Sequence, residues 1–421
     1  MTITIQSNYL VFPVYTYATE KKLIFQHEGE TVYTLNLKLD NATPDFYAYI
    51  DVSRFMGKDI ELLVTPEMEI SCRETDEMDL DNLYREANRP QVHFTVKNGF
   101  LGNPKGIFYA NETYHLFYQY NPAGIEEGNT HLGHAVSKDL IHWQEEKTEV
   151  FPNEKGKLDC LGIMKKYSQS ENFEIFALSD SEGHQKWVSM DETGKYSVGH
   201  IENGQFLSEQ PEQILRYGNA DCIGQQILLA DGRVIRIDGT SWEAARLPFC
   251  GQMGIPTELS LKKEEDLYYV QALPIKELEI LYKNTNCYEN IGIEKTVEIP
   301  IADAAHLIRL KGNFDENVIL DLILFGRRIR IDFTENQISV GNKNVPISIT
   351  KKDLDLTLLI DRCSMEIFTD GGKICLASLS AETVMDRNLL NFILNCNIEY
   401  KISMLEFHAL NPIWQTSPKK N

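Results

Sequence analysis

The sequence lacks three features that would each have indicated a common class of protein. No apolar run approaches the roughly 20 residues that a helix needs to span a bilayer, and the eight cysteines show no C-x-x-C spacing. Basic residues are in deficit, because 41 Lys and Arg stand against 62 Asp and Glu, for a formal net charge of -21. Nucleic acid and anionic membrane surfaces repel an acidic protein. We therefore expect no nucleic acid and no membrane as partners.

The start of the printed sequence also lacks a basic segment followed by an apolar one, the pattern of a secretory leader. Scattered cysteines in such a chain favour reduced and mostly buried thiols over disulfides or a metal site. We therefore expect a cytoplasmic protein that binds no metal and needs no cofactor.

Short runs with alternating apolar and polar residues make up much of the chain. Period-two alternation between turn residues is typical of strands, and 421 residues suffice for two or three domains. The sequence therefore predicts an all-β protein. Examples of such runs are Ile107–Tyr109, His115–Tyr118, Phe173–Leu178, Gln226–Leu229, Val234–Ile237 and Leu356–Ile360.

The first 88 residues are predicted to form a compact β-rich module. The strands expected there lie near Tyr9–Tyr15, Thr31–Leu39, Phe46–Val52 and Ile60–Val64. The acidic segment Asp76–Asn88 follows and is predicted to be a helical connector.

The segment from Phe100 to Trp143 contains HLFYQYNP, then GHAVS, then KDLIHW. This succession resembles the first propeller blade of glycoside hydrolase family 32. Gly251–Leu281 is similar to the propeller exit of that family, and Leu356–Gly372 to its C-terminal β-sandwich, with a hairpin turn at Asp370-Gly371. The resemblance implies a propeller over residues 89–283 and a β-sandwich over residues 284–421, after the N-terminal module at 1–88.

The propeller span is too short for the five blades that the family implies. From His93 to Tyr282 the chain has 190 residues, and a four-stranded blade needs about 40–45. Between Trp143 and Val198 only 54 residues remain. We therefore expect a shortened propeller that lacks the second and third blades or large parts of them. Its exposed blade edges are expected to be covered by the N-terminal module or by a second copy of the chain.

The catalytic nucleophile of the family is replaced by an amide. A retaining glycosidase needs two carboxyl groups about 5–5.5 Å apart, and the family's nucleophile is the Asp of a Trp-Met-Asn-Asp-Pro-Asn-Gly segment. The matching residues Phe100–Gly106 have Asn103 at that position. An amide cannot form the glycosyl-enzyme ester, and the family's Arg-Asp-Pro motif does not occur in this chain.

The other candidate site residues follow from the same resemblance. Asp159 in Leu158-Asp159-Cys160 matches the Glu-Cys motif of the general acid, but it could equally belong to the strand that opens the second blade. Gln119 and His134 are candidates for sugar binding, and each could instead only build the blade. Asp221, in a segment similar to the start of the fifth blade, is a third candidate for substrate binding.

Three functions remain open at this point. The chain could be an active β-fructosidase that uses a rearranged carboxylate pair such as Asp159 and Asp221. It could instead be a relative without hydrolytic activity that binds fructan, sucrose or another glycan. It could also be a structural or regulatory protein that binds no sugar. The replaced nucleophile and the missing motif favour the second and third functions over the first.

Overall fold

The computed structural model describes residues 1–40, 43–78, 83–147, 175–218, 223–241, 247–302, 304–341, 343–347, 353–379 and 390–414. Strands dominate this part of the chain, and its helices are the short 3-10 turns η1 (Ser53–Phe55), η2 (Lys276–Leu281) and η3 (Asp370–Gly372). The prediction of an all-β protein is confirmed. Across the described ranges no helix has the length and apolar character that would let it cross a membrane.

The N-terminal module consists of two sheets packed face to face. One sheet has the order β1 (Thr2–Thr4), β6 (Asp59–Thr65), β3 (Glu20–His27) and β4 (Glu30–Lys38). The other has the order β5 (Phe46–Asp51), β2 (Tyr9–Val14) and β7 (Arg73–Thr75). Alternate residues such as Leu23 and Phe25 point into the shared core and are fully buried. The four strands predicted for this module are confirmed.

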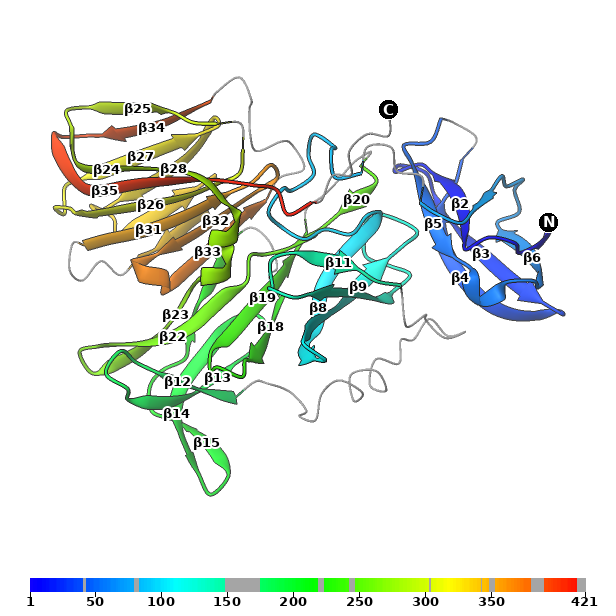
Figure 1. The fold of residues 1–421 in the computed structure, drawn as a ribbon, viewed down its shortest axis with the longest axis horizontal. Coiled ribbons are helices and arrows are strands. Elements are labelled where there is room, and N and C mark those ends of the chain that lie inside the picture. Colours follow the sequence, from blue (N-terminus) through cyan, green and yellow to red (C-terminus); the bar gives the residue numbers. More distant parts are fainter. Residues whose placement is uncertain are drawn as a thin grey trace.

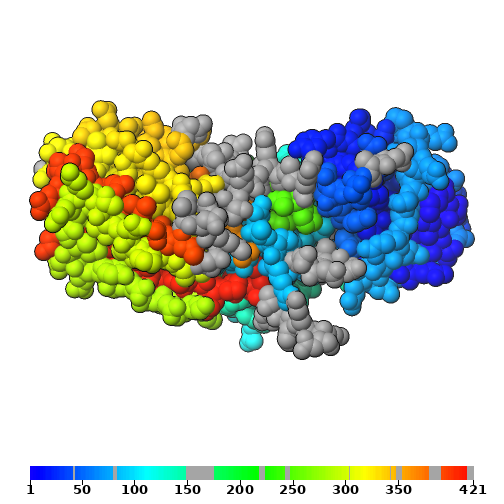
Figure 2. Space-filling model, turned by 90° about the horizontal axis from the view of Figure 1, so that it is seen from above, coloured from blue at the N-terminus to red at the C-terminus, as the bar shows by residue number. Residues whose placement is uncertain are grey.

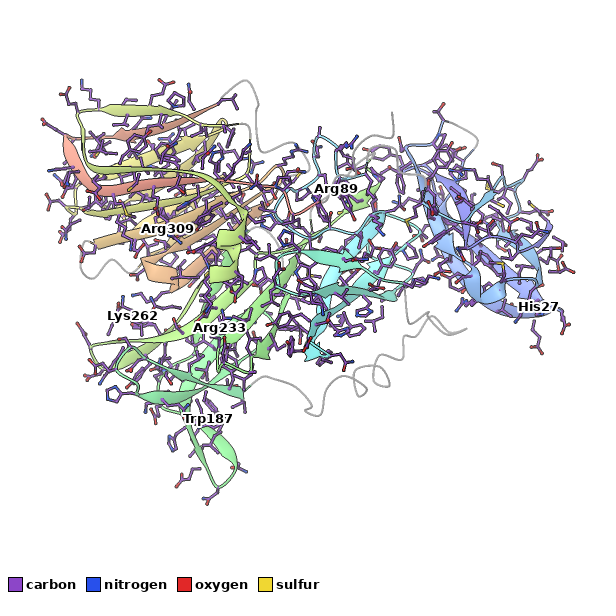
Figure 3. All side chains as sticks on the ribbon, viewed as in Figure 1. His27, Arg89, Trp187, Arg233, Lys262 and Arg309 are labelled. Carbon is purple, nitrogen blue, oxygen red and sulfur yellow. The ribbon has the colours of Figure 1, made fainter. Side chains whose placement is uncertain are left out.

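The helix predicted over Asp76–Asn88 is wrong for the described part of that segment. Residues 76–78 and 83–88 form bends and turns. A short polar segment without an apolar stripe has too little packing energy to offset helix nucleation. The chain is instead held by the buried Arg89, which donates to Thr95 Oγ1 at 2.9 Å and lies over the Phe249 ring at 3.5 Å. Figure 3 labels Arg89 beside the strand β20.

The middle of the chain forms three antiparallel sheets of blade type (Figure 1). The first contains β8 (Gly99–Ala110), β9 (Thr113–Asn121), β10 (His131–Ser137) and β11 (Trp143–Glu145), with β20 (Phe249–Cys250) added beside β8. The second contains β12 (Ile175–Ser179), β13 (Gln185–Met190), β14 (Lys195–Glu202) and β15 (Gln205–Ser208), with β16 (Gln213–Ile214). The third contains β18 (Ile223–Leu228), β19 (Val234–Thr240), β22 (Thr257–Glu264) and β23 (Leu267–Pro274), with β21 (Gln252–Met253).

The third sheet lies between the other two. Strand β8 of the first sheet contacts β18 and β19, and β12 of the second sheet contacts β22. Three such sheets in the described residues, where the family implies five, confirm the shortened propeller. In the sequence, residues 148–174 come between the first and second sheets, and they are not among the described residues.

The C-terminal part is the predicted β-sandwich. Its seven-stranded sheet has the order β17 (Arg216–Gly218), β33 (Ile374–Leu379), β32 (Ser364–Thr369), β31 (Asp353–Ile360), β26 (His306–Asn313), β35 (Tyr400–Leu410) and β24 (Tyr282–Ile293). Its six-stranded sheet has the order β25 (Thr296–Pro300), β34 (Asn391–Cys396), β27 (Ile319–Leu324), β28 (Arg327–Asp332), β29 (Gln337–Val340) and β30 (Lys343–Pro346). The predicted turn at Asp370-Gly371 joins β32 to β33.

A buried ion cluster joins the propeller entrance to the sandwich. Asp361, just after β31, accepts hydrogen bonds from the backbone N–H groups of Gln91 and Val92 and from His93 Nδ1 at 2.9 Å. His93 Nε2 also lies 3.9 Å from Glu366 Oε2 on β32. His93 and Asp361 therefore connect two parts of the chain that lie far apart in the sequence.

The three parts lie in a row (Figure 2), with the N-terminal module at one end and the sandwich at the other. The N-terminal module shares its core with the propeller, because Phe100, Ala123 and Ile125 pack into the same buried cluster as its own strands. It therefore covers one end of the first sheet. The boundaries predicted after residues 88 and 283 stay predictions.

Candidate functional site

Asn103 lies in an irregular stretch of β8. The pairing of β8 with β9 shifts in register between Leu101 and Pro104 and again between Pro104 and Gly106. Pro104 has no N–H to donate to the neighbouring strand, which favours a bulge at this place. Asn103 is half-buried in this bulge. Bulges change the direction of the side chains beside them, so this is the position in β8 where a site residue can turn out of the sheet.

The neighbouring strand β19 packs closely against the bulge. A Cβ atom at Gly239 would lie 3.0 Å from the Cα of Asn103 and 2.7 Å from the Cδ of Pro104. Only a residue without a side chain fits such a close approach between strands. The backbone of β19 therefore forms one wall beside Asn103, and no side chain at position 239 contributes to this wall.

Asp238, the residue before Gly239, is a buried carboxylate close to the bulge. It is 2% exposed, and Arg236 Nε donates to its Oδ1 at 2.8 Å while the Arg216 guanidinium donates to Oδ2. Burial opposes the ionisation of Asp238, but the two guanidinium groups hold its pKa below the ordinary value. A carboxylate that stays ionised has no proton to donate. Asp238 is therefore unsuited to act as a general acid.

Gln119 lies beside the bulge, whereas His134 is packed further along the same sheet. A Cβ atom at Gly102 would lie 3.0 Å from the Cβ of Gln119, so Gln119 and Asn103 are close together. His134 is 5% exposed, its ring stacks on Phe117 with centroids 4.5 Å apart, and its Nε2 lies 3.0 Å from the Nδ1 of His115. Such a histidine holds two strands together, and its ring face is already occupied.

Two of the candidate site residues, Asp159 and Asp221, lie outside the described residues. The structure therefore brings together Asn103, Gln119 and the backbone of Gly239, and gives no position for a carboxylate pair made of Asp159 and Asp221.

The charged group around Asp238 was missed by sequence reasoning. The run Val234-Ile235-Arg236-Ile237-Asp238 carries two charged residues at i and i+2 of an otherwise apolar strand, which puts both on one face. Charged side chains are almost never fully buried unless they are paired. This spacing in an apolar strand was the signal for an internal ion pair.

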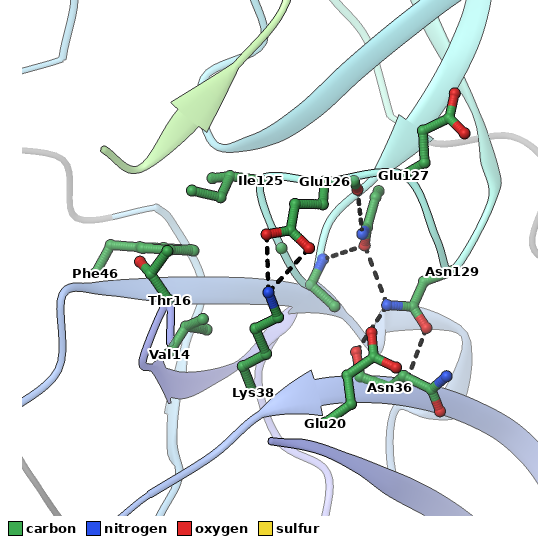
Figure 4. Close-up of a pocket in the computed structure, with 13 residues that line it drawn as sticks. Val14, Thr16, Glu20, Asn36, Lys38, Phe46, Ile125, Glu126, Glu127 and Asn129 are labelled. Carbon is green, nitrogen blue, oxygen red and sulfur yellow. Dashed lines mark hydrogen bonds and ion pairs between the residues drawn. The ribbon is translucent and has the colours of Figure 1, made fainter. Parts of the chain in front are cut away.

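Two small hollows lie between the N-terminal module and the first sheet. The first, shown in Figure 4, has a volume of about 20 Å³ and holds the ion pair of Lys38 with Glu126 at 2.8 Å. The second has a volume of about 30 Å³ and is lined by tyrosines, among them Tyr9 and Tyr49. Each has room for about one or two waters, so neither can hold a sugar ring.

A third hollow is much larger, with a volume of about 420 Å³, and lies between the second sheet, β23 and the sandwich. None of these three hollows is lined by Asn103, Gln119 or His134.

The comparisons with known proteins agree with this geometry. Residues 93–162 match the model of the glycosyl hydrolases family 32 N-terminal domain, and residues 323–387 match the glycosyl hydrolases family 32 C terminal model. The chain is similar to an invertase of Schizosaccharomyces pombe, with 44% identity over 71 residues, which are 17% of this chain and 12% of the invertase. It is also similar to a levanase of Bacillus subtilis, with 38% identity over 110 residues, which are 24% of this chain and 16% of the levanase.

Among solved structures, the fold is similar to that of the exo-inulinase from Aspergillus awamori. The TM-score is 0.61 at 15% identity, over 79% of this chain and 100% of that chain. The fold class is thus a β-propeller joined to a β-sandwich. Both family models that match are those of glycosyl hydrolase family 32, while the matched segments span 12% and 16% of the two curated relatives named above.

Proposed function

We propose that this protein is a family 32 relative without hydrolytic activity that binds a glycan containing fructose. The observation that carries the loss of activity is the half-buried amide of Asn103 in the β8 bulge. Removing a nucleophile that works as part of a catalytic unit costs on the order of 10⁶ in turnover. No replacement comes from β19, because the residue that packs on the bulge is Gly239 and the carboxylate next to it is committed to two arginines.

The proposal that a glycan is bound is supported by the relatives. Those that match are described as an invertase, a levanase and an exo-inulinase, and a fructofuranosidase of the same fold was solved with fructose bound.

The test measures fructose release and glycan binding on the same preparation. Sucrose, sucrose phosphate, inulin and levan are incubated with the protein, with the Asn103→Asp variant and with Asn111→Asp, which makes the same change in the exposed turn between β8 and β9. We expect no fructose release from any of the three proteins, because the carboxylate that lies near Asn103 among the described residues, Asp238, is held ionised and cannot donate a proton. Fructose release by the unmodified protein would refute the loss of activity and favour the active enzyme with Asp159 and Asp221. Release by Asn103→Asp alone would attribute the loss to the amide and contradict the absence of a proton donor beside it.

Binding is measured by calorimetric titration with short inulin and levan oligosaccharides. We expect saturable binding without turnover. The absence of binding across all of these glycans would refute the proposal and favour a structural or regulatory role.

A cytoplasmic location, and a second copy of the chain on the exposed blade edges, also remain proposals. Cell fractionation tests the first, and sedimentation of the purified protein tests the second, with a monomer at micromolar concentration as the result against it.

A further inference from the structure

The hollow of about 420 Å³ lies where three elements meet: the second sheet with its added strand β16, the strand β23, and the turn η3 of the sandwich. Its volume is within the range of about 300–1,000 Å³ that is typical of small-molecule sites. Ligand sites also occur preferentially where two domains meet. The Asn103 bulge lies elsewhere, on β8 of the first sheet.

Three tyrosines, Tyr196, Tyr217 and Tyr269, line this hollow. Tyr196 is held in place, because its hydroxyl donates to Gln213 Oε1 at 2.9 Å and accepts from the backbone N–H of Val270 at 3.1 Å. Tyr217 is half-buried, and burial raises the pKa of its hydroxyl. Tyrosine combines an apolar ring face with a polar tip. A wall of this kind suits a ligand that also has apolar faces and hydroxyl edges.

Fixed charge lies beside Tyr269, because Lys373 Nζ is 4.8 Å from the centre of the Tyr269 ring. Lys373 is 5% exposed, and its Nζ lies 2.6 Å from Glu264 Oε2 and 2.5 Å from Asp370 Oδ2. Gln271 Nε2 donates to the carbonyl of Gly371 at 2.6 Å and so holds the turn that presents Asp370. Lys262 Nζ also lies 2.8 Å from Glu264 Oε1, so Glu264 and Asp370 are balanced by two ammonium groups. Glu212, which also lines the hollow, leaves one negative charge in excess. An anion such as a sugar phosphate is therefore disfavoured, while the hydroxyls of a neutral ligand can donate to these carboxylates.

We propose that this hollow is a glycan-binding site for neutral sugar units, with Tyr217 and Tyr269 packing against sugar rings and Asp370 accepting hydrogen bonds from their hydroxyls. The inference rests on the proposed function, since it locates the glycan binding of the protein, and it places that binding away from Asn103.

The experiment titrates the full chain with a short inulin oligosaccharide by calorimetry and compares four proteins. These are the wild type, Tyr217→Ala, Asp370→Asn and the control Tyr288→Ala, which removes an exposed tyrosine from β24 of the sandwich. Asn adopts the positive φ of 54° found at Asp370 as readily as Asp does, so Asp370→Asn removes the charge and keeps the turn. Circular dichroism confirms that each variant is folded.

We expect Tyr217→Ala and Asp370→Asn each to weaken binding roughly tenfold or more, and Tyr288→Ala to leave it unchanged. Inorganic phosphate alone is expected not to bind. If Tyr217→Ala and Asp370→Asn both bind the oligosaccharide as tightly as the wild type does, this inference is overturned and the proposed function still stands. Absence of binding by the wild type would overturn the proposed function and the inference with it.

Discussion

The buried pair of His93 and Asp361 makes the stability of this protein depend on pH in a defined range. Burial works against protonation of His93, but its hydrogen bond to Asp361 and the nearby carboxylate of Glu366 raise its pKa to about 9 from the ordinary value of 6.5. Burial also opposes ionisation of Asp361, whose pKa is nevertheless lowered by the His93 side chain and by the backbone N–H groups of Val92 and Gln91. The folded state therefore holds His93 as a cation at neutral pH.

The sign and size of the effect follow from linkage. Because the pKa of His93 is higher in the folded state, its contribution to stability is complete below pH 6.5 and is lost as pH rises towards 9. The pKa of His93 lies about 2.5 above its value in the unfolded chain. At about 1.36 kcal/mol per pKa unit, this difference contributes about 3 kcal/mol to the free energy of unfolding. Between pH 6 and pH 10 the free energy of unfolding should therefore fall by an amount of this order on account of His93 alone.

The variant that isolates this effect is His93→Asn. An Asn amide N–H can occupy the place of the Nδ1 donor and keep the hydrogen bond to Asp361, but it does not titrate in this range. The assay is urea unfolding, followed by circular dichroism at several pH values from 6 to 10. At each pH the free energy of unfolding of the variant is subtracted from that of the wild type. Other groups of the acidic chain titrate equally in both proteins and cancel. A difference that stays constant from pH 6 to pH 10 would refute a protonated His93.

Three further changes test other parts of the structure by urea unfolding. Asp238→Asn should cost about 3–5 kcal/mol, because it leaves two buried guanidinium groups without their counter-charge; a cost below about 1 kcal/mol would contradict the ion cluster. Gly239→Ala should lower the free energy of unfolding by about 1–3 kcal/mol, because its methyl group meets β8. The control Gly292→Ala should not destabilise the protein, because no atom lies within 4 Å of the added methyl group. Equal effects of the two substitutions would contradict the close contact between β19 and β8. Lys38→Ala should cost less than about 1 kcal/mol, since its partner Glu126 is 59% exposed, and a larger loss would show that this pair holds the N-terminal module.

Much of the strand pattern could be predicted from the sequence, because side chains alternate between the two faces of a strand. The runs at Tyr9–Tyr15 and Leu356–Ile360 lie in strands β2 and β31, whose ends differ from the predicted ones by three residues at most. The turn at Asp370-Gly371 was also predictable, since both residues adopt positive φ there and such positions favour Asp and Gly. The structure of the connector Asp76–Asn88 could not be predicted, because its polar sequence fits both a solvated helix and a series of turns.

The candidate site was predictable in its chemistry and not in its surroundings. The resemblance placed an amide at position 103, and Gln119 does lie beside it. No local pattern indicated that Gly239, 136 residues further along, would pack on the bulge, or that Arg216 would join Arg236 on Asp238.

The sequence by itself determined that this chain is β-rich, that it resembles family 32 with a shortened propeller, and that it lacks the carboxylate of a nucleophile. These properties depend on residue type and on spacing along a single strand or hairpin. Only the tertiary structure decided which charges are buried together, as when Asp361 accepts the N–H of Gln91, 270 residues earlier, and where a hollow remains between the second sheet and the sandwich. The physical reason is that burial and pairing depend on how sheets formed by distant segments pack, which no local alternation encodes.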